Sequence, residues 1–145
     1  EIVFPCGGGI YTSAAEAAAK TNGKIIGVDS DQKGVIDGSY GDGMTVTSAM
    51  KGLAQTVNTV LTAIQNDKWD DYKAQVQSLG LVSENPEENY VQLAPSTQWS
   101  DDFNEDAYKE LVAKMFKGEY EVSNATDAMP ATEIVSVDDQ GSIKG

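Results

Sequence analysis

Hydrophobic and polar blocks at the start of the chain predict the order strand, turn, helix, strand. Residues 1–6 form an apolar run followed by three glycines, which predicts a short strand and a tight turn. Ser13 and Glu16 have the spacing of a capping box before an alanine-rich helix, which an asparagine-glycine pair ends. Residues 24–28 are short, apolar and β-branched, as in a buried parallel strand. The pattern predicts a βαβ unit, with ligand-binding loops at the carboxyl ends of its strands.

The next part of the chain is predicted to be a loop followed by one long helix. Residues 33–43 are polar and rich in glycine, which favours a loop. Beyond them, apolar residues recur at helical spacing and predict a helix with one apolar face: Val46, Met50, Leu53, Val57, Val60, Leu61 and Ile64.

Short strands are predicted in the second half of the chain. Residues 74–82 and 90–93 favour strands, and the polar segment 83–89 between them favours an exposed turn. Residues 132–137 predict a terminal strand.

A final helix is predicted between the last two of these strands. Asn104 is expected to cap it and Gly118 to stop it, and its apolar face comprises Tyr108, Leu111, Val112, Met115 and Phe116. Strands and helices therefore alternate along the chain, which predicts an α/β fold with a parallel sheet flanked by helices.

Composition and charge limit the fold and the classes of partner that this chain can bind. With 40% hydrophobic and 23% charged residues, the chain is expected to fold as a single α/β unit over residues 1–145. Acidic residues outnumber basic ones by 23 to 10, and the net charge of -13 repels a phosphate backbone, so nucleic acid is not expected as a partner. No stretch approaches the about 20 apolar residues that a membrane helix needs.

The cysteine and histidine content limits the catalytic chemistry. Cys6 is the single cysteine, which excludes an internal disulfide, and its place in an apolar run predicts a small core residue. The chain has no histidine, which excludes a Cys/His zinc site and the Ser-His-Asp and Cys-His forms of catalysis. We therefore expect no enzyme activity and no cofactor.

The glycine loop has two interpretations. Glycines let backbone N–H groups approach a phosphate at a helix N-terminus, but Thr12 stands where a GxGxxG motif needs glycine, and no GK[ST] motif is present. A tight turn that packs strand against helix is the stronger interpretation. The bare backbone of Gly8 and Gly9 can also border an uncharged ligand.

Calcium is one candidate ligand for the loop that follows residue 28. Asp29, Asp31 and Gly34 match the first, third and sixth positions of an EF-hand loop. Lys33 and Tyr40 occupy the fifth and twelfth positions, where oxygen ligands are needed, and a strand rather than a helix precedes the loop. These departures argue against a calcium site.

Two carboxylates and an amide at the end of this strand suit the capture of hydroxyl groups. An ionised aspartate accepts two hydrogen bonds from the vicinal hydroxyls of a sugar, and the candidates are Asp29, Asp31 and Gln32. Lys51 is expected one turn into the next helix, where its ammonium group can pair with Asp29 and donate to the same hydroxyls. Helix capping and a surface lysine explain the same residues, so spacing leaves both interpretations open.

Five segments occur in the order in which one known family has them. Residues 1–20 resemble its strand, paired-glycine loop and helix, and IGVDSDQ at 26–32 is similar to its most recognisable stretch. The similarity continues in TVTSAMKGLAQTV (45–57), NYVQLAPS (89–96) and YKELVAKMFKGEYEV (108–122). In these segments the sequence resembles the basic membrane protein family of bacterial lipoproteins, the purine-nucleoside receptors that serve ABC transporters.

The resemblance implies a type I periplasmic-binding-protein fold, in which two Rossmann-like lobes close over a nucleoside. Members are longer than this chain, so the resemblance implies a C-terminal portion that forms mainly one lobe. Asp29 would hold the ribose hydroxyls with the assistance of Lys51, and the full set of implied ligand-binding residues is Asp29, Lys51, Gly8, Gly9, Asp31 and Gln32. Ile10 and Tyr11 stand where relatives have Thr-Gly, which changes the wall of the expected pocket.

The implied function is that of an extracytoplasmic solute-binding protein, a cell-surface lipoprotein whose lipid anchor is absent from this chain. It would bind a purine nucleoside or another ribose-bearing solute and deliver it to the permease subunits of an ABC transporter. The membrane would be reached only through that anchor. The alternative is a sugar-binding, sensory or regulatory ligand-binding domain of the same fold.

Overall fold

Four strands form one sheet in the computed structural model, which describes residues 1–129 and 131–141. They lie side by side in chain order: β1 (Ile2–Val3), β2 (Lys24–Asp29), β3 (Thr45–Lys51) and β4 (Val91–Leu93). β1, β2 and β3 are parallel, and β4 pairs with β3 in the antiparallel direction. The sheet and its flanking helices confirm the α/β class.

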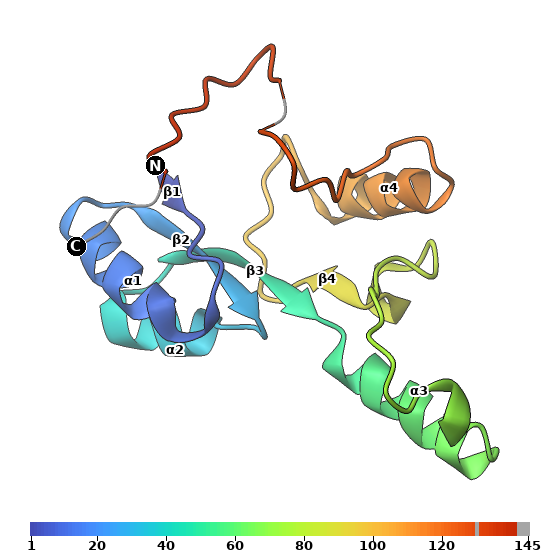
Figure 1. Ribbon diagram of the computed structural model, residues 1–145. Helices are drawn as coiled ribbons and strands as arrows, with labels where there is room; N and C mark the ends of the chain where they lie inside the picture. The colour runs from blue at the N-terminus through green and yellow to red at the C-terminus, as the bar shows by residue number, and fades with distance from the viewer. Residues whose placement is uncertain (130, 142–145) are drawn as a thin grey trace.

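Two helices cover one face of this sheet and form the core with it. α1 (Tyr11–Lys20) and α2 (Lys33–Tyr40) lie side by side against β2 and β3 (Figure 1). The buried residues between them are apolar: Ala15, Ala18, Ile25, Ile36 and Met44. The alanines of α1 allow the helix backbone to approach the sheet closely, which explains why an alanine-rich segment packs here.

The ends of α1 correct one prediction and confirm another. The helix begins at Tyr11, directly after the 3-10 turn η1 (Gly8–Ile10), and no side chain caps it, so the predicted capping box is wrong. Glu16 pairs instead with Lys20 at 2.9 Å. The predicted stop is confirmed: Asn22 takes a left-handed φ of 54°, and the N–H of Gly23 donates to the carbonyl of Ala18 at 2.8 Å.

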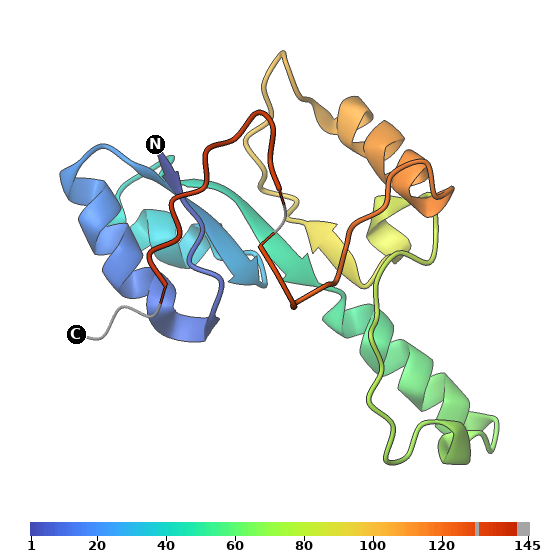
Figure 2. The same ribbon diagram turned by 45° about the horizontal axis from the view of Figure 1, so that its top comes forward.

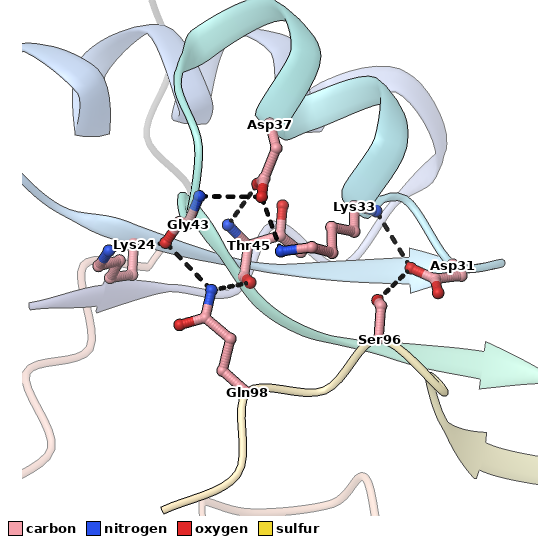
Figure 3. A network of polar contacts seen from close by, with 8 residues as sticks. All are labelled: Lys24, Asp31, Lys33, Asp37, Gly43, Thr45, Ser96 and Gln98. Carbon is pink, nitrogen blue, oxygen red and sulfur yellow. Dashed lines mark hydrogen bonds and ion pairs between the residues drawn. The ribbon is translucent and has the colours of Figure 1, made fainter.

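The predicted loop at residues 33–43 is wrong, because α2 forms there. Ile36 is fully buried against α1, so packing supplies what the glycine-rich sequence lacks in helix propensity. The carboxylate of Asp37 then anchors the turn into β3 by accepting from Gly43 N–H at 3.0 Å and Thr45 N–H at 2.8 Å (Figure 3). It also pairs with the Lys33 ammonium at 2.9 Å.

The predicted long helix divides into a strand and a shorter helix. Val46, Met50 and Lys51 lie in β3, and the helix is α3 (Leu53–Gln65). β3 forms because it pairs on both sides, with β2 and with β4. Gly52 separates the two elements, and its N–H donates to the carbonyl of Tyr90 at 2.7 Å.

α3 extends away from the sheet, as both views show (Figures 1 and 2). The apolar face that the sequence predicts is exposed on it and comprises Leu53, Val57, Leu61 and Ile64. The chain returns through the short 3-10 turns η2 (Trp69–Asp71) and η3 (Pro86–Glu88). The strand predicted at residues 74–82 is wrong, because this segment is irregular and Val76 is completely exposed.

The turn at residues 83–89 is confirmed as a turn, but part of it is buried. Asn89 is 0% exposed, and its side chain accepts from the N–H groups of Val82 and Ser83 and donates to the carbonyls of Ser83 and Asn85. This amide holds the turn together, and the strand predicted directly after it is β4.

The final helix is confirmed as α4 (Glu105–Phe116). Asn104 caps it by accepting from the N–H of Ala107 at 3.0 Å, and Gly118 ends it with a φ of 75°. The strand predicted at residues 132–137 is wrong, since this segment has neither strand nor helix. Cys6 is exposed, so its prediction as a core residue is also wrong. Within the described ranges, no helix has the length and apolar character needed to cross a membrane.

Candidate functional site

The carboxyl ends of β2 and β3 bring Asp29 and Lys51 together. Asp29 is the last residue of β2 and pairs in register with Met50, one residue before the end of β3. The Lys51 ammonium lies 2.8 Å from Oδ1 of Asp29. The predicted pairing is therefore confirmed, although Lys51 reaches Asp29 from a strand end and not from a helix.

This ion pair is open to solvent. The side chain of Lys51 is 68% exposed and that of Asp29 is 45% exposed. The pKa of Lys51 is raised, first by its hydrogen bond to Asp29 and then by the charge of that carboxylate. Exposed ion pairs contribute little to folding stability, so this pair is better placed to contact a ligand than to hold the fold.

The chain that follows β1 reaches the same edge of the sheet. β1 is parallel to β2, with Val3 opposite Ile25, so the segment after β1 runs towards the same edge of the sheet at which β2 ends. Gly8 and Gly9 come next and form the start of η1. A side chain at either glycine would meet no atom within 4 Å, so their backbone faces open space. Neither hydrogen-bonds to Asp29 in the part of the chain that the structure covers.

Asp29 sits in a strained backbone turn. Its φ is 68°, in the left-handed region, and the N–H of Ser30 donates to the carbonyl of Val28 at 2.8 Å across it. A three-residue γ-turn with positive φ at its centre is rare and strained for a residue with a side chain. Such strain is typical of functional positions. The turn ends β2 abruptly and presents the carboxylate at the sheet edge.

Gln32 holds this turn, and Asp31 holds the loop that follows it. Oδ1 of Asp31 accepts from the N–H of Lys33 at 3.1 Å and from the hydroxyl of Ser96 at 2.7 Å (Figure 3). The side-chain carbonyl of Gln32 accepts from the N–H of Val28 at 2.9 Å, and the backbone N–H of Gln32 donates to the hydroxyl of Ser48 at 3.1 Å. The structure thus places both beside the candidate site, with their side chains engaged in the protein's own hydrogen bonds.

Gly27 and Ser48 support the site, and neither was predicted to do so from the sequence. A β-carbon on Gly27 would lie 2.5 Å from Oγ of Ser48 and 2.9 Å from Oε1 of Gln32. Only glycine leaves room for these two side chains under the strand end. The position of Gly27 could have indicated this, because a glycine inside an apolar strand often marks a close approach by other atoms.

The geometry suits hydroxyl recognition. Oδ2 of Asp29 accepts no hydrogen bond from the described residues, and the Lys51 ammonium has donors left beyond its one contact with Oδ1. An acceptor beside a donor matches two neighbouring hydroxyls, each of which both donates and accepts. Within the described ranges, no three acidic or cysteine side chains gather closely enough to hold a metal ion.

Comparison with protein-family models and with curated proteins gives no match for this chain. The resemblance noted in the sequence therefore stays a prediction.

Proposed function

We propose that this chain forms one lobe of an extracytoplasmic solute-binding protein that captures purine nucleosides and delivers them unchanged to an ABC permease. The observation that supports it is the strained turn that presents Asp29 beside Lys51 at the carboxyl edge of a parallel sheet. Open α/β sheets bind their ligands at this edge. The α/β lobe agrees with the periplasmic-binding-protein fold that the sequence resembles.

In the proposed complex, Asp29 accepts hydrogen bonds from the 2′ and 3′ hydroxyls of ribose. Lys51 stays beside the carboxylate and donates to an oxygen of the same diol. The backbone of Gly8 and Gly9 borders the sugar, since it leaves the space next to it unfilled. A second lobe would cover the base and exclude water, which is why we expect this lobe alone to bind weakly.

Saturation-transfer NMR tests the proposal, because it detects weak binding and reports which ligand protons touch the protein. Inosine, guanosine and adenosine should receive saturation mainly at the ribose protons H2′ and H3′. A 2′,3′-dideoxynucleoside, which lacks the diol, should receive at least about tenfold less, as expected for a site whose charged hydrogen-bonding groups lose their partners. Equal saturation of the dideoxy compound would refute diol recognition.

The variant that tests the carboxylate is Asp29→Asn, because asparagine adopts the left-handed backbone at this position at a lower cost than alanine. Its matched control is Asp70→Asn, since Asp70 also forms an exposed ion pair, with Lys73 at 2.7 Å. We expect Asp29→Asn to weaken nucleoside binding by tenfold to a hundredfold, on the order of a lost charged hydrogen bond, and the control to bind like the wild type.

A sugar-binding receptor or sensor of the same fold is the second candidate. The observation that favours it is that the paired carboxylate and ammonium of Asp29 and Lys51 suit hydroxyls and offer no group specific for a base. Free ribose distinguishes the two, because a nucleoside receptor gains affinity from the base. Ribose that binds more tightly than any nucleoside would favour the sugar receptor.

A further inference from the structure

A second concave site lies between β4, η3 and α4. It encloses about 230 Å³ and shares no residue with the Asp29 site. This volume is below the roughly 300–1,000 Å³ of pockets that hold drug-sized ligands, so its occupant must be small. The walls are apolar and aromatic and the rim is charged: Pro86, Glu87, Gln92, Leu93, Ala94, Pro95, Trp99, Glu105, Tyr108 and Lys109.

Two aromatic rings form one wall and are fixed in place. The ring centroids of Trp99 and Tyr108 are 5.7 Å apart at an interplanar angle of 32°. The hydroxyl of Tyr108 accepts from the N–H of Leu93 at 3.1 Å, which ties the ring to the edge of β4. The ring of Phe103 also packs against this indole, with the two centroids 6.1 Å apart. The aromatic wall is therefore formed before any ligand arrives.

The rim carries more negative than positive charge. Lys109 is paired with Glu105 at 2.6 Å, which leaves the carboxylate of Glu87 in excess. No basic side chain in the described ranges forms an ion pair with Glu87. The backbone carbonyl of Glu87 accepts from the side chains of Gln55 at 2.7 Å and Gln92 at 2.8 Å, which fixes this residue at the rim.

Aromatic faces beside an excess carboxylate favour a cation and disfavour an anion. Ring faces attract cations because their electron-rich surfaces are negative. A primary ammonium has three N–H donors to satisfy, and the side chains of the two prolines and Leu93 offer no acceptor, so only the carboxylates and Gln92 could accept from it. A methylated ammonium has no N–H to satisfy and loses its water at lower cost.

We propose that this pocket binds a small methylated ammonium compound of the choline type, with its head group against Trp99 and Tyr108 and its charge balanced by Glu87. The pocket would thus be a second ligand site, independent of nucleoside binding.

Tryptophan fluorescence tests the proposal with choline chloride as the probe. A Trp69→Phe background leaves Trp99 as the only indole, because the chain has two tryptophans. We expect saturable quenching by choline at constant ionic strength. The neutral isostere 3,3-dimethylbutan-1-ol should bind at least about fivefold more weakly, because it lacks the charge that the ring faces and Glu87 attract.

Glu87→Gln is the informative variant, because Glu87 is exposed and its side chain holds no other element. It should weaken choline binding about fivefold, as expected for loss of the balancing charge. Glu88→Gln is the matched control, since Glu88 is the next residue and does not line the pocket. It should bind choline like the wild type.

Four results would overturn the proposal. Quenching that rises linearly without saturation would show no site, and equal binding of the neutral isostere would show a purely apolar pocket. Tighter binding of butylamine than of choline would assign the pocket to primary amines. Tighter binding of glycerophosphocholine would assign it to a choline head group attached to phosphate.

Discussion

The carboxylate of Asp37 offers the most direct test of how α2 and the sheet are held together. The side chain of Asp37 is 9% exposed, and it accepts from the ammonium of Lys33 and the N–H groups of Gly43 and Thr45. These contacts join α2 to the start of β3, and β3 carries Lys51 at its other end. Replacing Asp37 with asparagine removes the charge and turns an N–H donor toward groups that themselves donate.

The pKa of Asp37 indicates how much its carboxylate stabilises the folded state. Burial raises this pKa, but the hydrogen bonds from Lys33, Thr45 and Gly43 outweigh burial and lower it from 3.8 to about 2. Because the pKa is lower in the folded state than in the unfolded chain, the carboxylate stabilises the fold fully above the unfolded value. That stabilisation is lost as the pH falls from about 4 through 2. A shift of this size corresponds to about 2 kcal/mol.

Urea unfolding followed by circular dichroism at several pH values measures this contribution. At pH 7, Asp37→Asn should lower the free energy of unfolding by about 2 kcal/mol. The difference between variant and wild type should shrink towards pH 2.5, because there the carboxylate is protonated in the unfolded chain while the folded protein still keeps it mostly ionised. Asp70→Asn, an exposed control, should change stability little at any pH. A loss from Asp37→Asn that is the same at pH 7 and pH 2.5 would refute the electrostatic reasoning.

Three glycine substitutions test the packing around the site, each by urea unfolding. Gly27→Ala should destabilise the fold by about 2 kcal/mol because its β-carbon would lie 2.5 Å from Oγ of Ser48, and Ser48→Ala should recover part of this loss. Gly52→Ala should cost more than Gly27→Ala, about 3 kcal/mol, because its β-carbon would lie 2.7 Å from the backbone carbonyl of Asn89. Gly34→Ala should stabilise α2 by about 0.5–1 kcal/mol, because nothing lies within 4 Å; a loss there would contradict the packing described.

The parts of the fold that local patterns specify were predictable. The β1–α1–β2 unit and the capped helix α4 follow from apolar runs, an alanine-rich segment and a cap residue, and the structure contains them. α2 was missed because its two glycines favour a loop locally, whereas the burial of Ile36 and the hydrogen bond from Thr45 to Asp37 depend on the tertiary fold. A helix at α2 could still have been predicted from the expected parallel sheet, since two successive parallel strands need a crossover between them, usually a helix.

Residues 45–51 were predicted as helix because their apolar residues have helical spacing. The same spacing is compatible with β3, a strand that pairs on both sides. Val46 and Met50 fit the helical spacing of α3, but Thr45, Val46 and Thr47 form a β-branched run that favours a strand. Residues 74–82 and 132–137 were overpredicted, because a β-branched run forms a strand only where a partner strand lies beside it. In the structure these segments are irregular.

The two central residues of the candidate site were predictable, but the hydrogen bonds that hold the loop around them were not. Asp29 and Lys51 were expected to pair, and they do, at 2.8 Å. The loop that follows Asp29 is held by residues far along the chain, because Ser48 accepts from the backbone N–H of Gln32 and Ser96 donates to Asp31.

The most direct test of the proposed function is a titration of the ¹⁵N-labelled chain with inosine, followed by amide chemical shifts. The account predicts concentration-dependent shifts at the sheet edge, at Gly8, Gly9, Asp29 and Lys51, that persist in Asp70→Asn and disappear in Asp29→Asn. No shift at millimolar inosine, or shifts confined to other parts of the chain, would contradict it.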